Sequence, residues 1–149
     1  MSWALSDEEI EDLLDKAEVG RLGLSYRDTP YVIPLCFIYY REALYFHCSP
    51  EGRKMDYLQN NNKACCQIDQ IGGIIPSEKP CKYNIGFKSV LAEGTIAPVA
   101  DKGERFTVLQ EMVKKYGSKE TAEKLTPGDL DRVQILKLNI DRLSGCAKG

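Results

Sequence analysis

Apolar residues recur with helical spacing in two segments of the chain. In the first, Ser6 and Glu9 form a capping-box pattern ahead of the periodic residues, which predicts a helix within residues 1–18. Its apolar positions at i, i+3, i+4 and i+7 are Ile10, Leu13, Leu14 and Ala17. In the second segment, Asp101 and Glu104 repeat the capping pattern. The apolar stripe that follows them is Phe106, Leu109, Met112, Val113 and Tyr116.

Between these two helices the pattern is that of β-strands. Residues 31–40 are rich in β-branched and aromatic side chains, and both alternating sets of positions are apolar. Such a strand is buried on two sides, by a barrel interior on one face and by a helix or a second subunit on the other. Pro34 has no N–H to donate to a sheet, so the strand needs a free edge or a bulge there. A tight turn at Arg41–Glu42 leads into a return strand over residues 43–48.

Shorter signals predict the remaining elements. Ser49 is expected to cap a helix with Pro50 in its first position, and this helix ends at residues 60–62. Residues 71–82 contain two glycines and two prolines and are expected to form a long loop, and residues 144–149 a loose tail. Further strands are expected within residues 21–25, 64–69, 83–99 (with a bulge at Gly94) and 133–141, and short helical turns within 119–124 and 127–131.

These elements amount to six or seven strands, joined mainly by short turns, with three or four helices set around them. An antiparallel barrel with peripheral helices, mainly β in class, fits this order better than a doubly wound parallel sheet. The whole chain, residues 1–149, is expected to form one domain. Because the apolar strands leave surface uncovered, a homodimer is the simplest expectation for the assembly.

Composition narrows the classes of function. Twenty basic against 22 acidic residues leave a net charge of −2, which disfavours a general affinity for nucleic acid or for an anionic membrane. No apolar run approaches the roughly 20 residues of a membrane span, and the acidic N-terminus does not resemble a secretory signal. The six cysteines form no C-x-x-C pair and there is one histidine, so no metal site is expected. We expect free thiols, most of them buried, in a cytoplasmic protein.

The segment from His47 to Lys54 holds the clearest candidate chemistry. Ser49, Arg53 and Lys54 lie around a predicted helix N-terminus, where free N–H groups and the helix dipole attract anions. Two cations in a first helical turn are unfavourable unless an anion offsets them, although a capped helix with two solvated charges accounts for the same pattern. His47 ends the preceding strand and is either a structural histidine or a proton carrier beside the anion site.

A second polar pair interrupts an apolar strand near residue 90. Lys88 and Ser89 could add a cation and a hydroxyl to a ligand site. Alternatively, Lys88 is a charged residue that protects the edge of a sheet from pairing with other chains.

Three stretches of the sequence, taken in order, resemble one family of proteins. They are PYVIPL (residues 30–35), YFHCSPEGRK (residues 45–54) and KSV (residues 88–90) with Gly94. This set is similar to the pyridoxamine 5′-phosphate oxidase-like flavin-binding proteins, and within them to the nitroimidazole-resistance branch. The likeness spans residues 10–145. The chain lacks the arginine-rich C-terminal substrate site of the vitamin-forming oxidases, which argues against oxidation of pyridoxamine phosphate.

The resemblance implies an antiparallel split β-barrel that binds FMN at the interface of a homodimer. The implied cofactor-binding residues are Pro34, Leu35, Cys36, Phe37, His47, Ser49, Arg53, Lys54, Lys88 and Ser89. Among them, Ser49, Arg53 and Lys54 would hold the phosphate, and residues 34–37 would lie along the isoalloxazine ring. His47 would be the catalytic residue, close to the flavin or the substrate.

The implied function is that of an oxidoreductase. FMN would pass electrons or hydride from a reduced nicotinamide or a similar donor to a small acceptor such as a nitroaromatic compound, while the protein binds and tunes the cofactor. Two alternatives stay open. One is a non-catalytic flavin-binding store or redox sensor, and the other is a haem-handling relative with His47 as the iron ligand.

Overall fold

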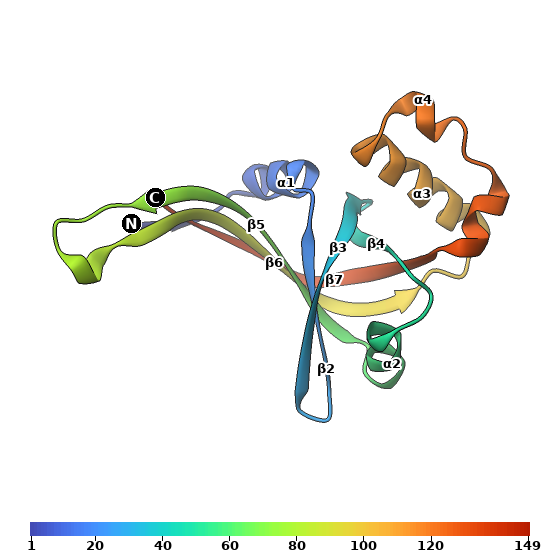
Figure 1. Ribbon diagram of the computed structural model, residues 1–149, viewed down its shortest axis with the longest axis horizontal. Helices are drawn as coiled ribbons and strands as arrows, with labels where there is room; N and C mark the ends of the chain where they lie inside the picture. Colours follow the sequence, from blue (N-terminus) through green and yellow to red (C-terminus); the bar gives the residue numbers. More distant parts are fainter.

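Seven strands form one sheet in which every pairing is antiparallel. They are β1 (Ser2–Ala4), β2 (Gly20–Tyr26), β3 (Thr29–Tyr40), β4 (Ala43–Cys48), β5 (Lys63–Ile75), β6 (Asn84–Pro98) and β7 (Gln134–Lys148). The order β7-β4-β3-β2-β5-β6 closes on itself because β6 also pairs with β7, and β1 adds to the far end of β7. The computed structural model describes all of residues 1–149 and confirms the predicted antiparallel split β-barrel (Figure 1).

The helices lie on the outside of this barrel (Figure 1). They are α1 (Asp7–Lys16), α2 (Arg53–Asn60), α3 (Lys102–Tyr116) and the short α4 (Lys119–Ala122), together with the 3₁₀ turns η1 (Pro80–Lys82) and η2 (Pro127–Arg132). All the predicted helical segments are present. None of these helices combines the length and the apolar character that crossing a bilayer requires.

Both predicted amphipathic helices begin at their predicted caps. The Ser6 hydroxyl accepts the Glu9 N–H at 3.1 Å and the Glu9 carboxylate accepts the Ser6 N–H at 3.3 Å, which completes a capping box. At α3 the Asp101 carboxylate accepts the Glu104 N–H at 2.8 Å. The Glu104 carboxylate does not reciprocate, because it accepts the Tyr45 hydroxyl at 2.6 Å and so ties the start of α3 to β4. The first helix is shorter than residues 1–18, since β1 precedes it.

Two apolar clusters occupy the two faces of the barrel wall. The barrel interior contains, among others, the fully buried side chains of Leu22, Phe37, Leu44, Phe46, Ile68, Leu136 and Leu138. A smaller cluster lies outside the wall beneath α3 and includes Ile38, Tyr45, Val108, Met112 and Ile135. The strand with two apolar faces behaves as predicted over its second half, where Phe37 points into the barrel and Ile38 packs under α3.

β3 changes its partner halfway along. Residues 29–35 pair with β2, and residues 36–40 pair with β4, so each half has one edge without a neighbouring strand. Side chains of α3 form hydrogen bonds with the backbone at the free edge of the second half of β3. The Tyr116 hydroxyl accepts the Phe37 N–H at 3.0 Å, and the Lys115 ammonium donates to the Phe37 carbonyl at 3.0 Å. These contacts replace the ladder that a strand would make.

Prolines protect the free edge of the first half of β3. The N–H and carbonyl of Phe37 point away from the β4 side of β3. Because backbone groups alternate in direction along a strand, the N–H and carbonyl groups of the even-numbered residues of β3 point toward the β4 side. Pro30 and Pro34 occupy two of these positions and have no N–H, so Val32 supplies the one N–H along this edge. The predicted free edge at Pro34 is confirmed.

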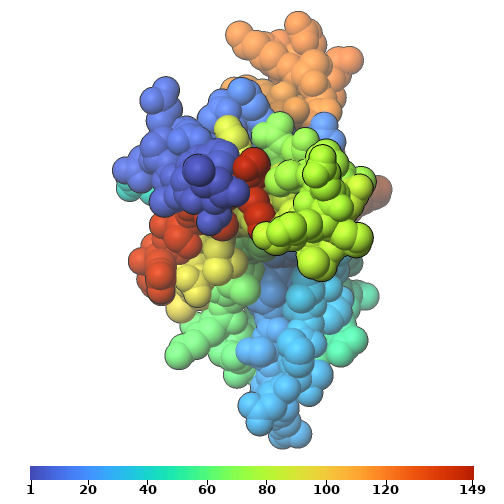
Figure 2. Space-filling view, turned by 90° about the vertical axis from the view of Figure 1, so that its left-hand side faces the viewer, coloured from blue at the N-terminus to red at the C-terminus, as the bar shows by residue number.

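Two segments that were expected to be irregular belong wholly or partly to strands. The expected loop over residues 71–82 is shorter than predicted, because β5 extends to Ile75 and pairs with β6 through a register shift between Ile71 and Gly73, and only residues 76–83, with the turn η1, connect the two strands. The expectation of a loose tail over residues 144–149 is wrong, because β7 continues to Lys148 between β6 and β1. Figure 2 shows the end of β7 between the N-terminal segment and the β5–β6 hairpin. This end of β7 has small residues without strong alternation, and its pairing partners are distant in sequence, so the sequence does not indicate a strand there.

Substitution of Gly94 by alanine tests the bulge that the sequence predicts. The register of β6 against β7 shifts between Glu93 and Gly94, which confirms the irregularity there. A methyl group at Gly94 would overlap the carbonyl oxygen of Asn139. We expect Gly94→Ala to lower the free energy of unfolding by about 1–3 kcal/mol, the usual cost of overpacking.

Urea denaturation measures this loss, and Gly128→Ala is the matched control, because its nearest neighbour would be the Thr126 hydroxyl at 3.8 Å. Equal denaturation midpoints for the two variants would contradict the assignment.

The Lys115 contact predicts a pH dependence of stability. Burial lowers the pKa of Lys115 from its ordinary value of 10.5 to about 8. The folded chain therefore loses this proton before the unfolded chain does, and between about pH 8 and pH 10 the unfolded state binds more protons. Over that range the free energy of unfolding of the wild type should rise with pH relative to that of Lys115→Met. Parallel pH profiles of the two urea midpoints would show that Lys115 is not desolvated.

Candidate functional site

The four predicted ring-contact residues of β3 face two different ways. Pro34 and Cys36 are exposed on the outer face of the barrel, whereas Leu35 packs against the interior cluster. Phe37 is completely buried in that interior, and its N–H and carbonyl already bond to side chains of α3. Phe37 is therefore not available to a ligand from outside. What remains is an apolar surface of Val32, Pro34 and Cys36, which we call the outer strip, with Val32 63% exposed.

Ser49, Arg53 and Lys54 gather at the start of α2, although Ser49 is not the helix cap. The cap is Gly52, whose φ of 114° is the kind of backbone that glycine adopts most readily. The Ser49 hydroxyl instead accepts the Glu51 N–H at 3.4 Å. Because glycine has no side chain to cap the helix, the N–H groups of Arg53 and Lys54 have no partner within the chain. The prediction of Ser49 as cap and Pro50 as first helical residue is wrong, although Ser49, Arg53 and Lys54 do lie in one short segment around the start of α2.

The two cations of this cluster are in different environments. Arg53 is exposed, and its guanidinium lies 4.6 Å from the centre of the Tyr31 ring and 5.4 Å from that of Tyr57. Lys54 is only 6% exposed, and its ammonium donates to the Glu51 carbonyl at 3.3 Å. Lys54 takes part in none of the ion pairs of the chain. Lys54 is thus a buried residue whose ammonium has one carbonyl partner and no carboxylate, so it has donor capacity left for a further acceptor.

His47 lies on β4 directly opposite Cys36 of β3, with its side chain on the outer face. The two residues line a hollow of about 330 Å³ together with residues of α3 and its C-cap, which we call the α3 hollow. Its other lining residues are Leu109, Met112, Val113, Tyr116 and Gly117. Burial lowers the pKa of His47, so the imidazole is neutral at pH 7 and can accept a proton. The next residue, Cys48, points into the barrel.

Lys88 and Ser89 are separated by the pleat of β6. Lys88 lies on the α1 side, where its ammonium is 3.9 Å from the Glu9 carboxylate. Ser89 lies on the other face and accepts a hydrogen bond from the Gln67 amide at 3.0 Å. The alternative interpretation of Lys88 as an edge residue is wrong, because β6 pairs on both sides at this point. The structure therefore does not bring Lys88 to the other candidates, whereas Ser89 shares the outer face of the barrel.

Ser89 belongs to a polar network that the sequence analysis missed. The Gln67 amide also donates to the Asp69 carboxylate at 2.9 Å, and Arg21 lies 3.7 Å from the same carboxylate. Arg21 in turn is paired with Pro34, so the network adjoins the outer strip. These residues come from three strands that are far apart in the sequence. A single polar residue on an exposed strand face is common, so none of them indicates a network by itself.

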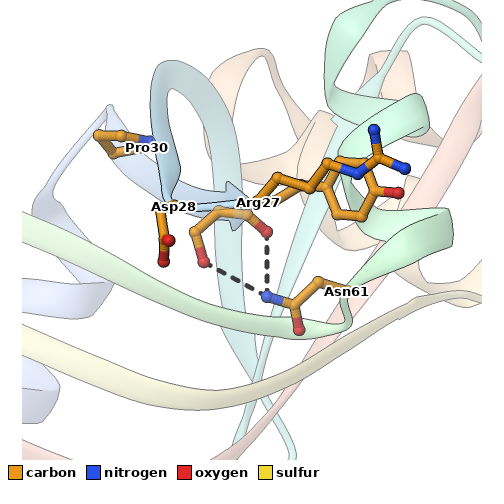
Figure 3. Close-up of a pocket in the computed structure, with 6 residues that line it drawn as sticks. Arg27, Asp28, Pro30 and Asn61 are labelled. Atoms are coloured by element: carbon orange, nitrogen blue, oxygen red, sulfur yellow. Dashed lines mark hydrogen bonds between the residues drawn. The ribbon is translucent and has the colours of Figure 1, made fainter.

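A separate hollow lies at the turn between β2 and β3, and Figure 3 shows it in close-up. The Asn61 amide, which follows α2, donates to the Ser25 carbonyl at 2.9 Å and to the Ser25 hydroxyl at 3.3 Å. Arg27 and Asp28 have positive φ values of 50° and 58°, which fit a two-residue hairpin turn. The polar groups here anchor the turn to α2, and none of the predicted site residues lines this hollow.

All six cysteines are free, as predicted, but they are not uniformly buried. Cys48 and Cys66 are buried and behave as small apolar residues, whereas Cys36, Cys81 and Cys146 are exposed. Cys65 points away from Cys66 because adjacent strand residues face opposite sides, as expected.

Comparisons with known proteins agree with this fold. The curated protein RA0666 of Rhizobium meliloti (strain 1021), which is uncharacterized, is 30% identical over 64 residues. That match covers 43% of this chain and 42% of that protein, less than half of its length.

Two solved structures are similar to nearly the whole chain. A Bacteroides thetaiotaomicron protein assigned to 5-nitroimidazole antibiotic resistance has a TM-score of 0.82 and 23% identity, and the match covers 99% of this chain and 87% of that one. The FAD and heme binding protein of Mycobacterium smegmatis has a TM-score of 0.85 and 23% identity, with 97% and 72% covered.

The family model described as pyridoxamine 5′-phosphate oxidase matches residues 6–147. This match includes the outer strip, the cluster at the start of α2 and the whole barrel. It confirms the family to which the sequence motifs point, and the chain belongs to the pyridoxamine 5′-phosphate oxidase family.

Proposed function

We propose that this chain binds FMN and acts as an oxidoreductase that passes electrons or hydride from a reduced nicotinamide or similar donor to a small acceptor such as a nitroaromatic compound. The observation that carries the proposal is the buried Lys54 ammonium, which has one carbonyl partner and no carboxylate. A phosphate monoester would supply the missing negative charge. The similar protein of Mycobacterium smegmatis binds a flavin, FAD, which supports a flavin as the ligand here.

The groups around Lys54 fit a terminal phosphate. The free N–H groups of Arg53 and Lys54 at the start of α2 can each donate to a phosphate oxygen, and the helix dipole favours a negative charge there. Ser49 can offer its hydroxyl, and the exposed Arg53 guanidinium can leave the aromatic rings it covers to form a charged hydrogen bond. Together with the Lys54 ammonium, these backbone N–H, hydroxyl and guanidinium donors suit the single phosphate of FMN.

The outer strip is suited to a flat aromatic ring. Val32, Pro34 and Cys36 expose apolar surface beside an edge whose carbonyls and single N–H have no strand partner. Bound FMN would supply the redox chemistry, because its ring accepts and releases electron pairs. His47 would accept a proton near that ring, because burial lowers its pKa and leaves the imidazole neutral at pH 7. Ser89 would add a polar contact across the outer face.

The assembly proposed for this site is a homodimer in the cytoplasm. The outer strip lacks a covering element, and apolar side chains are also exposed on the extended β5–β6 hairpin, where Ile74 is 75% exposed. Covering these surfaces with a second copy would remove apolar area from water and enclose the ring on its open side.

The first test is a visible absorption spectrum of the purified protein, followed by release and identification of the ligand. We expect flavin absorption, release of FMN, and bleaching of the flavin band by reduced nicotinamide under anaerobic conditions. Release of FAD would replace FMN as the cofactor. A bound flavin that no donor reduces would favour a non-catalytic store or sensor, and a Soret band that disappears in His47→Ala would favour the haem-handling alternative.

Lys54→Met tests the phosphate assignment directly. Loss of a charged hydrogen bond of about 1.5–3 kcal/mol should weaken FMN binding by about 10–100-fold. Riboflavin, which has no phosphate, should bind the variant and the wild type equally. Fluorescence titration measures both affinities, and Lys124→Met at an exposed lysine is the control. Equal losses for FMN and riboflavin would place the phosphate elsewhere.

Val32→Asp tests the proposed homodimer. A charge in the middle of the outer strip would be buried at the interface without a partner, so we expect the variant to be monomeric and to lose flavin. Analytical ultracentrifugation measures the oligomeric state, and Lys124→Asp is the control for an added carboxylate at an exposed site. A wild-type protein that is monomeric with flavin bound would refute the interface.

A further inference from the structure

Lys115 is a half-buried amine that has no carboxylate partner. Its ammonium donates to the Phe37 carbonyl at 3.0 Å and to the Leu14 carbonyl at 3.4 Å, and it lies 3.8 Å from the centre of the Phe37 ring. Lys115 takes part in none of the ion pairs of the chain, whereas the neighbouring Lys114 is paired with Glu111 at 3.0 Å. Of these two adjacent lysines, only Lys115 carries a charge that no ion pair holds.

This amine borders a hollow of about 390 Å³ that side chains of α1, β3 and α3 enclose, which we call the α1–α3 hollow. The two helices lie on either side of the end of β3 (Figure 1). Apolar and aromatic walls face the amine, and they are Leu14 of α1 and Ile38, Tyr39 and Tyr40 of β3. No lining residue belongs to the outer strip, to the α3 hollow or to the cluster at the start of α2, so the α1–α3 hollow stands apart from the proposed flavin site.

The surroundings of Lys115 leave part of it as a free amine near neutral pH. Burial lowers its pKa to about 8, although the charges of Asp15, Cys36 and Glu18 act in the opposite direction. An exposed lysine, with a pKa near 10.4, is almost entirely protonated at the same pH. A lysine that is desolvated in an apolar pocket is a recognised form of activated nucleophile.

The charged groups around the α1–α3 hollow favour a product that stays positive. Asp15 lines the hollow from α1 and takes part in no ion pair, and Glu18 acts on Lys115 from beyond the end of the same helix. Glu111 also lines the hollow, but Lys114 offsets its charge. The two unpaired carboxylates stabilise a cation at Lys115 and disfavour a ligand that brings a negative charge. An acylated lysine would lose its charge, whereas a protonated imine keeps it.

We infer that Lys115 captures uncharged aromatic aldehydes as a protonated imine in the α1–α3 hollow. The nitrogen lone pair forms a bond to the carbonyl carbon, and the carbonyl oxygen takes up the proton that the nitrogen releases. The hydroxyl group then leaves as water with one proton from solvent, which gives a C=N⁺–H group. One water is lost and nothing is oxidised or reduced. Because the product keeps one N–H, it can still donate to the Phe37 carbonyl and retain the link between α3 and β3.

The experiment treats the purified protein with 2-naphthaldehyde and sodium cyanoborohydride, which reduces the imine to a stable amine, and follows each lysine by peptide mass spectrometry. Lys114 and Lys124 are exposed and serve as controls within the same molecule. Since its amine is partly free and the hollow can hold the ring, Lys115 at pH 7 should react at least about tenfold faster than either control. A rate at Lys115 no greater than that at Lys124 would overturn the inference.

A pair of variants assigns the fast reaction to one side chain. Lys115→Arg keeps a positive charge and donors for the Phe37 carbonyl but has no nucleophilic amine, so the fast reaction should disappear from the intact protein. Lys114→Arg is the matched control and should leave it unchanged. Persistence of the fast reaction in Lys115→Arg would show that another amine is responsible.

Two further reagents separate the hollow from the reactivity of the amine. 6-Formyl-2-naphthoic acid has the same ring with a carboxylate, so it should react with Lys115 at least about tenfold more slowly than 2-naphthaldehyde does, and about equally with Lys124. Acetaldehyde needs no binding hollow and should show a smaller preference for Lys115 over Lys124. Equal preferences for acetaldehyde and 2-naphthaldehyde would show that the α1–α3 hollow does not bind the ring.

Discussion

The division of β3 between two partner strands is the constraint on which the rest of the structure depends. A strand of this length that pairs with β2 over one half and with β4 over the other leaves two sets of backbone groups without a ladder. One set is satisfied by Tyr116 and Lys115, which fixes the position of α3 against the barrel. The other set, along the first half of β3, has no partner, and two of its residues are prolines, which have no N–H to donate. The α3 hollow and the outer strip are the two consequences of this one arrangement.

The parts of the fold that could be predicted are those encoded by neighbouring residues. The capping box at Ser6, the helix after Asp101 and the hairpin through Arg41–Glu42 are local patterns, and each is present. The buried residues of α3 are Val108, Leu109 and Met112, so the predicted stripe is only partly correct. Pro34 indicated a free edge, because the absence of an N–H has a meaning that does not depend on tertiary structure. The cluster of Ser49, Arg53 and Lys54 was predicted for the same reason, since all three lie within one short segment.

The errors concern features that distant residues decide. Ser49 was a better cap than Gly52 by side-chain chemistry, but the chain enters α2 through a positive φ that only the glycine adopts readily. The end of β7 has small residues and no strong alternation, and it is a strand because β6 and β1 pair with it. Tyr116 is 79 residues away from the Phe37 backbone that it supports, so no spacing rule could connect them.

Lys54 and Lys115 are both shielded from solvent, but the chain provides partners for only one of them. Lys115 donates to two carbonyls, at 3.0 Å and 3.4 Å, and lies 3.8 Å above the Phe37 ring, so the chain itself provides its partners. Its lowered pKa shows that it can also give up its charge. Lys54 is more deeply buried but has a single carbonyl and unpaired N–H groups beside it. Since the chain itself provides the partners of Lys115 but not those of Lys54, the start of α2 is where the proposed phosphate would supply the missing partner.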